Sequence, residues 1–181
     1  EDDGWSADLE ASEPAKIATQ FFADRTKRLI TQNQSPDIPF EHSINPYKGC
    51  EHGCVYCFAR PTHAYLDLSP GLDFETKIFY KTNVRDRLLE AFRKPRYQCS
   101  TLAIGTNTDP YQPVEQRKRV MREVLEVLLE HRHPVSIVTK SALILRDLDL
   151  LEALAKQGLV SVNISVTTLQ NELKTKLEPR T

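Results

Sequence analysis

Short hydrophobic runs and helix-like stripes alternate along most of this chain. Runs rich in Val and Ile, bounded by turn residues, indicate buried strands, whereas apolar residues three and four positions apart indicate a helix with one buried face. Val84, Leu88, Leu89 and Phe92 form such a helical stripe. The predicted strands are 42–45, 76–82, 101–105, 135–139 and 159–166.

Helical patterns fill the intervals between these strands. The predicted helices are 57–66, 84–93 with Asn83 as its N-cap, 114–131, and one through Leu148, Leu151 and Leu154 that Gly158 ends. Leu173 and Leu177, four positions apart, indicate one more helix near the end of the chain. Because strand and helix alternate, the predicted fold class is α/β, with a parallel sheet built of right-handed βαβ units.

The first forty residues differ in composition from the rest. Residues 1–14 are acidic and poor in apolar side chains, which is typical of a disordered tail. Residues 15–30 mix Lys and Arg with Phe, Leu and Ile, and this pattern favours a solvated helix face, with contact to phosphates as the alternative. We therefore divide the chain into an acidic tail and N-terminal arm, 1–40, and one core, 41–181.

Composition and charge narrow the class of protein. The 24 Lys and Arg against 25 Asp and Glu give a net charge of -1, so no global field directs the chain to nucleic acid or a membrane. A local basic surface stays open. No apolar run approaches the roughly 18 residues of a membrane span, and no signal peptide opens the chain. With thiols in a metal-type spacing, this predicts a cytoplasmic protein with no membrane partner.

Three of the four cysteines lie in one short loop. Cys50, Cys54 and Cys57 are spaced Cys-x-x-x-Cys-x-x-Cys, and only Cys99 remains elsewhere. A cubane iron–sulfur cluster is usually held by four cysteines, one on each iron, so this loop would leave one iron with an open position. An open position is where a bound metal does chemistry.

Two other interpretations of the cysteine loop compete with the cluster. Zinc could be held by the three cysteines together with His52 or His63, since sites of three cysteines and one histidine are common. A disulfide framework is the other. It is disfavoured because cysteines are sparse in this chain and three crowded into one loop pair badly.

Polar residues follow the predicted strands at several points. Residues 106–109, Lys140 with Ser141, and Thr167 with Thr168 each begin where a predicted strand ends. Because the carboxyl ends of parallel strands meet at one edge, we expect these residues and the cysteine loop to converge on one rim.

The cysteine loop, with Tyr56 before its last cysteine, resembles the cluster-binding signature of the radical S-adenosylmethionine (SAM) enzymes. The stretches GLDFETKIFYKTN, GTNTDPYQPVE, HRHPVSIVTKS and LVSVNISVTTL resemble successive motifs of its spore photoproduct lyase-like branch, in particular the bacterial members of unassigned substrate. The resemblance runs from about Asn45 to Arg180 and implies an incomplete (β/α)6 barrel, a partial TIM-type barrel. The chain holds about four βα units of it, so we expect a fragment truncated at the C-terminal end.

This resemblance also implies the roles of individual residues. Cys50, Cys54 and Cys57 would bind three irons of a [4Fe-4S] cluster. The amino and carboxylate groups of SAM would chelate the fourth iron. Lys81 is a further candidate, with an exposed strand lysine as the alternative. The implied SAM contacts are Thr106, Asn107, Thr108 and Asp109 for the amino group, Lys140 and Ser141 for the carboxylate, Ser165 for the ribose and Tyr56 for the adenine.

The implied activity is that of a radical SAM enzyme, lyase-like and of unknown substrate. The cluster would reductively cleave SAM to a 5'-deoxyadenosyl radical that abstracts hydrogen from a substrate, for which nucleic acid is one candidate. Its partners would be SAM and an electron donor of the flavodoxin or ferredoxin type. Cys99 is expected to be a buried structural thiol, so DNA repair is not implied.

Two other functions are weighed against the radical SAM enzyme. One is a zinc-binding, nucleic-acid-binding module without catalysis. The other is a ferredoxin-like electron carrier, which is disfavoured because such clusters are closed by four cysteines.

Overall fold

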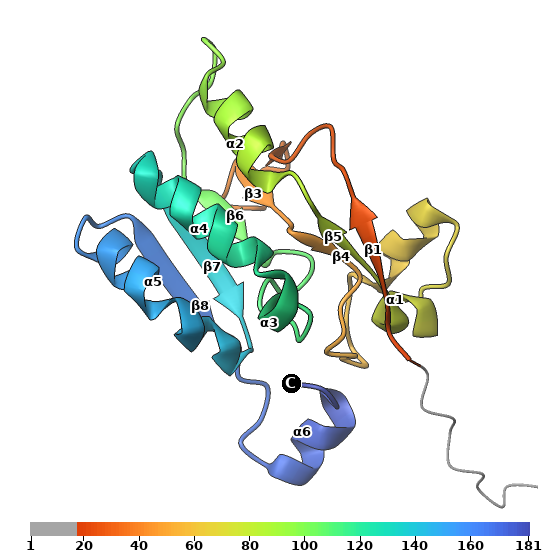
Figure 1. Cartoon of the computed structure of the whole chain (residues 1–181). Helices are drawn as coiled ribbons and strands as arrows, with labels where there is room; N and C mark the ends of the chain where they lie inside the picture. Colours follow the sequence, from red (N-terminus) through yellow and green to blue (C-terminus); the bar gives the residue numbers. More distant parts are fainter. Residues whose placement is uncertain (1–17) are drawn as a thin grey trace, which may run out of the picture.

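The computed structural model describes residues 18–181, which form two small sheets with helices packed against them (Figure 1). The larger sheet has the strand order β2-β3-β6-β7-β8, parallel throughout except for β2, which runs antiparallel to β3. Its strands are β2 (Thr31–Gln32), β3 (His42–Ile44), β6 (Leu102–Ile104), β7 (Val135–Thr139) and β8 (Val160–Ile164).

The smaller sheet has three strands in the order β1-β5-β4. Strand β5 (Lys77–Lys81) lies between β1 (Gln20–Asp24), which is parallel to it, and the short β4 (Tyr47–Lys48), which is antiparallel. The predicted strand 76–82 therefore forms, but it joins this second sheet. As a result β3 pairs directly with β6 in the larger sheet.

Three helices form a layer along one face of the larger sheet (Figure 1). Helix α4 lies between α2 and α5, and Val124, Leu125 and Leu128 on its apolar stripe are fully buried in the main core. The helices are α1 (Leu72–Thr76), α2 (Val84–Phe92), α3 (Glu115–Lys118), α4 (Val120–Glu130), α5 (Leu148–Ala155) and α6 (Asn171–Leu177), with 3-10 helices η1 (Arg60–Leu66) and η2 (Ala142–Asp147).

The basic segment 15–30 is not helical where the structure describes it, which corrects the prediction of a solvated helix. Residues Gln20–Asp24 form β1 because β5 offers them a parallel partner in continuous register, and Phe22 stacks on Phe79 with ring centroids 5.0 Å apart. The predicted acidic tail, 1–14, lies outside the described residues.

Two predicted helices differ in their boundaries, and a third, the helix through Leu148, forms as expected. The helix 114–131 is broken at Arg119, whose φ of +54° is left-handed, and the Glu115 carboxylate accepts a hydrogen bond from the freed Met121 amide. The helix 57–66 begins only at Arg60, as a 3-10 helix with Pro61 in its first turn. The helix through Leu148 follows directly on the 3-10 helix η2.

Asn83 does not cap α2 with its side chain, contrary to the prediction. The side-chain nitrogen Nδ2 of Asn83 instead donates to the carbonyl oxygen of Thr26, at 3.0 Å. This contact fixes the N-terminal arm against the start of α2. Within residues 18–181, no helix has the length and apolar character needed to cross a membrane.

Candidate active site

The cysteine loop meets the other predicted site residues at the carboxyl ends of the parallel strands. Ile44 pairs with Ile104, and Ile104 with Ile137, so the loops that leave β3, β6 and β7 emerge at the same end of the sheet. A cavity of about 220 Å³ lies there. The predicted residues that line it are Cys50, Cys54, Tyr56, Cys57, Asn107, Asp109, Lys140 and Ser165.

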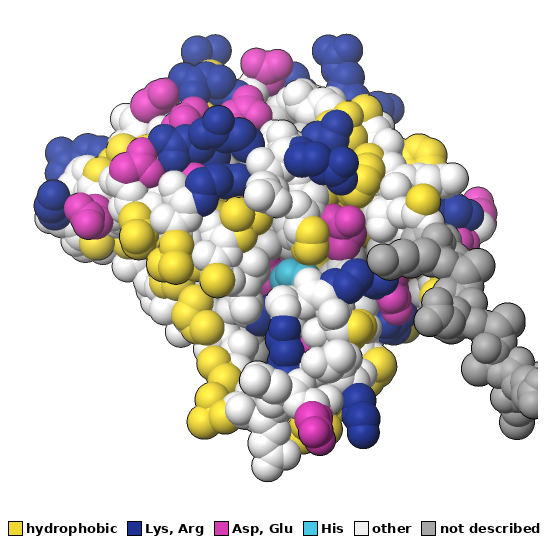
Figure 2. Space-filling view, turned by 60° about the horizontal axis from the view of Figure 1, so that its bottom comes forward, with side chains coloured by type: hydrophobic (Ala, Val, Ile, Leu, Met, Phe, Trp, Pro, Cys, Tyr) yellow, Lys and Arg dark blue, Asp and Glu magenta, His cyan; other side chains and the backbone are white. Residues whose placement is uncertain are grey.

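Figure 2 turns this end of the molecule toward the reader. Charged side chains and a histidine side chain lie close together near the centre of this face, and hydrophobic side chains follow one margin of it. The charged residues at the cavity include Lys140 and Asp109, and His52 also lines it.

The backbone of the loop is fixed from two sides. Gly49 has a φ of +80°, and a Cβ at this position would lie 2.9 Å from the carbonyl oxygen of Phe74, so the turn into Cys50 needs glycine. The Cys50 amide donates to the same Phe74 oxygen at 2.9 Å. From the other side, the Arg60 guanidinium donates to the Cys54 carbonyl oxygen at 3.0 Å and pairs with Glu75.

Burial keeps two of the loop thiols protonated when no metal is bound. It raises the pKa of Cys50 to about 12, and it also raises the pKa of Cys54, which the nearby Lys140 ammonium partly offsets. A thiolate is the form that binds a metal, so these thiols would release protons when a positively charged group enters the cavity.

His52 is buried against Asp109 in the wall of the cavity. The residue is 1% exposed, and its Nδ1 has no hydrogen-bond partner among residues 18–181. Nδ1 lies 3.6 Å from Asp109 Oδ2, which is too long for a hydrogen bond. Burial lowers the pKa of His52, so the ring is neutral at physiological pH.

The described residues 18–181 contain no group of three His, Cys, Asp or Glu side chains that could hold a single metal ion. The zinc alternative requires such a group. Of its two candidate histidines, His63 instead makes a 3.0 Å hydrogen bond with the Lys77 carbonyl oxygen and packs edge-on against Phe74. The geometry therefore does not favour zinc. A cubane cluster has no such requirement, since each cysteine binds a different iron.

Asp109 joins the loops that follow β6 and β7. Its Oδ1 accepts hydrogen bonds from the Thr139 hydroxyl at 2.6 Å and the Tyr111 amide at 2.9 Å, and its Oδ2 accepts from the Lys140 amide at 2.9 Å. The carboxylate thus holds Lys140 at the cavity, and it faces the cavity itself.

Lys140 is the centre of a polar cluster at the mouth of the cavity. Its Nζ donates to the Tyr56 hydroxyl at 2.8 Å and to Glu178 Oε1 at 2.7 Å, and it lies 5.2 Å from the centroid of the Tyr56 ring. Glu178 also accepts from the Thr167 hydroxyl at 2.6 Å and from Tyr56. Burial of Glu178 opposes its ionisation, but the hydrogen bonds from Lys140, Thr167 and Tyr56 outweigh this and lower its pKa to about 2.

Three predicted SAM contacts do not line the cavity. The Thr108 hydroxyl donates to the Tyr47 carbonyl oxygen at 3.1 Å inside the protein, and Ser141 uses its hydroxyl to cap η2 by accepting from the Leu143 amide at 3.2 Å. Thr106 is the third. The Thr108 and Ser141 side chains stabilise loops, which polar residues after strands commonly do.

Sequence reasoning missed Glu178 and Phe58 and considered His52 only as a zinc ligand. Glu178 reaches Tyr56 across 122 positions of sequence, and no local pattern marks such a contact. Phe58 lines the cavity although it is largely exposed, and its place next to Cys57 was its only sequence signal.

Lys81 is not the exposed strand lysine that was one of its two expected roles, and Cys99 is not the buried thiol that was expected. Lys81 does not line the cavity, and it is buried in β5, where its ammonium donates to the Asn45 carbonyl oxygen just before the cysteine loop. Burial lowers its pKa to about 8. Cys99 is exposed, not buried, because it lies in the loop before β6 and outside the packed strand.

Comparison with known proteins gives consistent family matches. The sequence model of the radical SAM superfamily matches residues 44–181. Uncharacterized proteins of Mycobacterium bovis and Mycobacterium tuberculosis are 45% identical over 144 residues, which is 80% of this chain and 42% of theirs. An uncharacterized protein of Methanocaldococcus jannaschii is 27% identical over 155 residues, 86% of this chain and 54% of its own.

The chain therefore spans about half the length of the curated relatives it matches. No solved structure gives a significant match. Members of the matched superfamily generally use a [4Fe-4S] cluster and SAM. The match covers the cysteine loop and all the loops that form the cavity, and the mixed α/β fold with its parallel strands agrees with it. The chain belongs to the radical SAM superfamily.

Proposed function

We propose that this chain carries the cofactor-binding part of a radical SAM enzyme, with Cys50, Cys54 and Cys57 as the ligands of a [4Fe-4S] cluster. One observation carries the proposal: the three thiols of one loop line a single cavity together with the polar side chains of three other loops. A closed four-cysteine site is not available in residues 18–181, because the fourth cysteine, Cys99, is exposed and away from the cavity. When bound, the cluster would supply one electron for reductive cleavage of SAM.

The cavity residues would bind and orient SAM. In this proposal Lys140 pairs with the SAM carboxylate, Asn107 and Asp109 accept hydrogen bonds from the amino group, Ser165 contacts the ribose and Tyr56 the adenine; all five residues line the cavity. Thr108 and Ser141 act on the same contacts only through the loops that they stabilise, and Thr106 does not line the cavity.

Binding of SAM requires Glu178 to leave Lys140. The ammonium is already paired with this carboxylate, and the cavity of about 220 Å³ is smaller than the roughly 300 Å³ at which small-molecule sites begin. The SAM carboxylate would replace that of Glu178, and the cavity would open as Glu178 moves outward.

The finer assignments rest on the branch resemblance. The enzyme would be spore photoproduct lyase-like, and its reaction would be lyase-like. Its electron donor would be of the flavodoxin or ferredoxin type, and nucleic acid is one candidate substrate. The same proposal treats 41–181 as part of a partial (β/α)6 barrel that continues beyond β8. Among the described residues β8 pairs with β7 alone, and exposed Val162 and Ile164 on β8 support further strands there.

Iron and sulfide content after anaerobic reconstitution tests the ligand assignment. Cys54→Ala should lose the cluster, whereas Cys99→Ala, which removes the cysteine outside the cavity, should bind as much iron and sulfide as the unchanged protein. His52→Ala should also keep its iron. Equal iron in the Cys54 and Cys99 variants, or one zinc per chain that the His52 variant loses, would contradict the proposal.

A further inference from the structure

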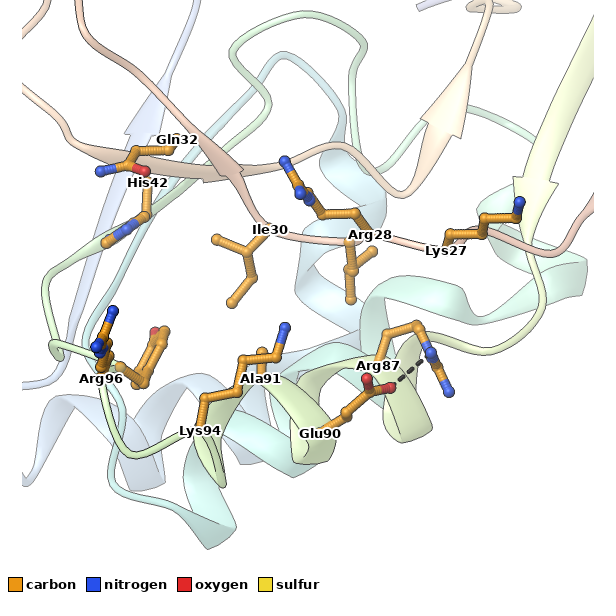
Figure 3. Close-up of a pocket in the computed structure, with 12 residues that line it drawn as sticks. Lys27, Arg28, Ile30, Gln32, His42, Arg87, Glu90, Ala91, Lys94 and Arg96 are labelled. Carbon is orange, nitrogen blue, oxygen red and sulfur yellow. Dashed lines mark ion pairs between the residues drawn. The ribbon is translucent and has the colours of Figure 1, made fainter.

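A second, larger cavity lies at the opposite end of the larger sheet. It has a volume of about 540 Å³ and is formed by the N-terminal arm between β1 and β2, by α2, and by the loop that follows α2 (Figure 3). His42, the first residue of β3, also lines it, whereas the cysteine loop follows the last residue of that strand. The proposed cofactor site does not use this cavity.

Positive charge dominates the lining of this groove. Five of the lining side chains are Lys or Arg, and the one carboxylate, Glu90, is paired with Arg87 at 2.5 Å (Figure 3). In the part of the chain that the structure describes, the other four have no carboxylate within 4.0 Å. They are Lys27, Arg28, Lys94 and Arg96.

Such a concentration of cations is local, because the chain as a whole has a net charge of -1. Like charges that face one cavity repel each other, and the repulsion is relieved when an anion enters between them. In Figure 3, Lys94 and Arg96 extend from one side toward the side that carries Ile30 and His42.

The walls of the groove are held by buried contacts. Leu29 is 3% exposed and belongs to the main core, so it anchors the arm between Arg28 and Ile30. The opposite wall is anchored through Tyr97, whose hydroxyl is 2.7 Å from His133 Nε2. The backbone that carries the lysine and arginine side chains of the groove is therefore held on both sides.

The lining combines cations with apolar and aromatic surface. Ile30 and Ala91 face the cavity, and at one end His42 stacks on Tyr97 with ring centroids 6.1 Å apart.

The volume of the groove lies within the roughly 300 to 1,000 Å³ of small-molecule sites. Arginine forks match phosphate oxygens, and aromatic faces bind planar bases. Among residues 18–181 these four cations have no carboxylate partner, and a ligand with a single carboxylate would neutralise only part of their charge.

We propose that this groove binds a nucleotide through its phosphates, either as a free nucleoside polyphosphate or as a unit of a nucleic acid strand. The phosphates would lie among Arg28, Lys94 and Arg96, and the base against the end formed by His42 and Tyr97. This inference does not depend on the cluster, because it uses none of the residues of the cofactor site.

Binding to the full chain, without iron or SAM, tests the proposal with two probes. Fluorescence anisotropy would follow a labelled single-stranded oligothymidylate, and calorimetry would follow ATP. The groove variant Lys94→Glu/Arg96→Glu changes two exposed side chains, and Lys156→Glu/Lys176→Glu gives the same change in net charge outside the groove. Thermal unfolding would verify that both variants fold.

We expect the groove variant to bind the probe with an affinity about tenfold lower, or lower still. The control variant should lose much less affinity. Binding of ATP would identify a free nucleotide as the ligand, and binding of the oligonucleotide alone would identify a strand. If neither probe binds, or if both variants weaken binding equally, the proposal is wrong.

Discussion

Gly105 shows how one residue can determine the shape of the cofactor cavity. It follows β6, lines the cavity and has a φ of +90°. A Cβ at this position would overlap the carbonyl oxygen of Val138 on β7, so a side chain would push apart the loops that carry Asp109 and Lys140. The backbone conformation and the missing space both require glycine here.

We predict that Gly105→Ala lowers the free energy of unfolding by at least about 3 kcal/mol, because it combines backbone strain with a clash against another backbone. Gly158→Ala is the matched control. Its φ is +67° but nothing lies within 4 Å of the added Cβ, so we expect a cost of only about 1 to 2 kcal/mol. Urea unfolding of both variants measures the difference, and equal costs would show that the clash is relieved at no expense.

At the scale of elements, the cofactor site depends on α6 as well as on the strands. Glu178 directly follows α6 and binds Lys140, which follows β7, so the contact joins the end of the described chain to the sheet. Another contact comes from Arg180, whose guanidinium binds Glu75 and whose amide donates to the His52 carbonyl oxygen at 3.3 Å. The two ion pairs thus attach this end of the chain to the elements around the cysteine loop, and backbone hydrogen bonds, such as that from the Val55 amide to the Leu177 carbonyl oxygen at 3.0 Å, attach it to the loop itself.

The stability that the ion pair between Lys140 and Glu178 contributes should depend on pH in a definite direction. The pKa of Glu178 falls from its usual 4.5 to about 2 in the folded protein, so the ionised carboxylate stabilises the fold above about pH 4.5. This stabilisation, on the order of 3 kcal/mol, is lost as the pH falls from 4.5 toward 2.

We predict that Glu178→Gln lowers the free energy of unfolding at pH 7 and that its difference from the unchanged protein shrinks below pH 4.5. Glu172→Gln, on the exposed surface of α6, is the control and should have little effect at either pH. Urea unfolding between pH 3 and pH 7 measures both. A Glu178 effect that stays constant over this range would contradict the ionic explanation.

The elements that sequence predicted best are those with a local signal. The buried runs at 135–139 and 102–104 and the stripe of α2 carry their own periodicity, so these strands and this helix lie close to where they were expected. Strand β1 was missed because its pairing partner, β5, lies more than fifty positions away in the sequence. The break at Arg119 was missed because it depends on the buried partners of Glu115.

For the whole molecule, topology predicted the rim and long-range contacts decided its details. The rule that loops meet at the carboxyl ends of parallel strands places Cys50, Asn107, Lys140 and Ser165 around one cavity, as expected. The rule could not indicate that the Glu178 carboxylate pairs with the Lys140 ammonium. Nor could it indicate that the Thr108 hydroxyl binds the Tyr47 carbonyl oxygen inside the protein. The only sequence signal for the basic groove at the other end of the sheet was the charge of the arm. The other cations of the groove come from α2 and the loop that follows it.

The measurement that tests the central claim most directly is the electron paramagnetic resonance spectrum of the anaerobically reconstituted, dithionite-reduced protein, recorded with and without SAM. If three cysteines hold a cluster whose fourth iron is open to SAM, the spectrum should show a reduced [4Fe-4S] signal that changes when SAM is added. A protein that binds zinc and forms no cluster, or a cluster whose signal is the same with and without SAM, would contradict the account.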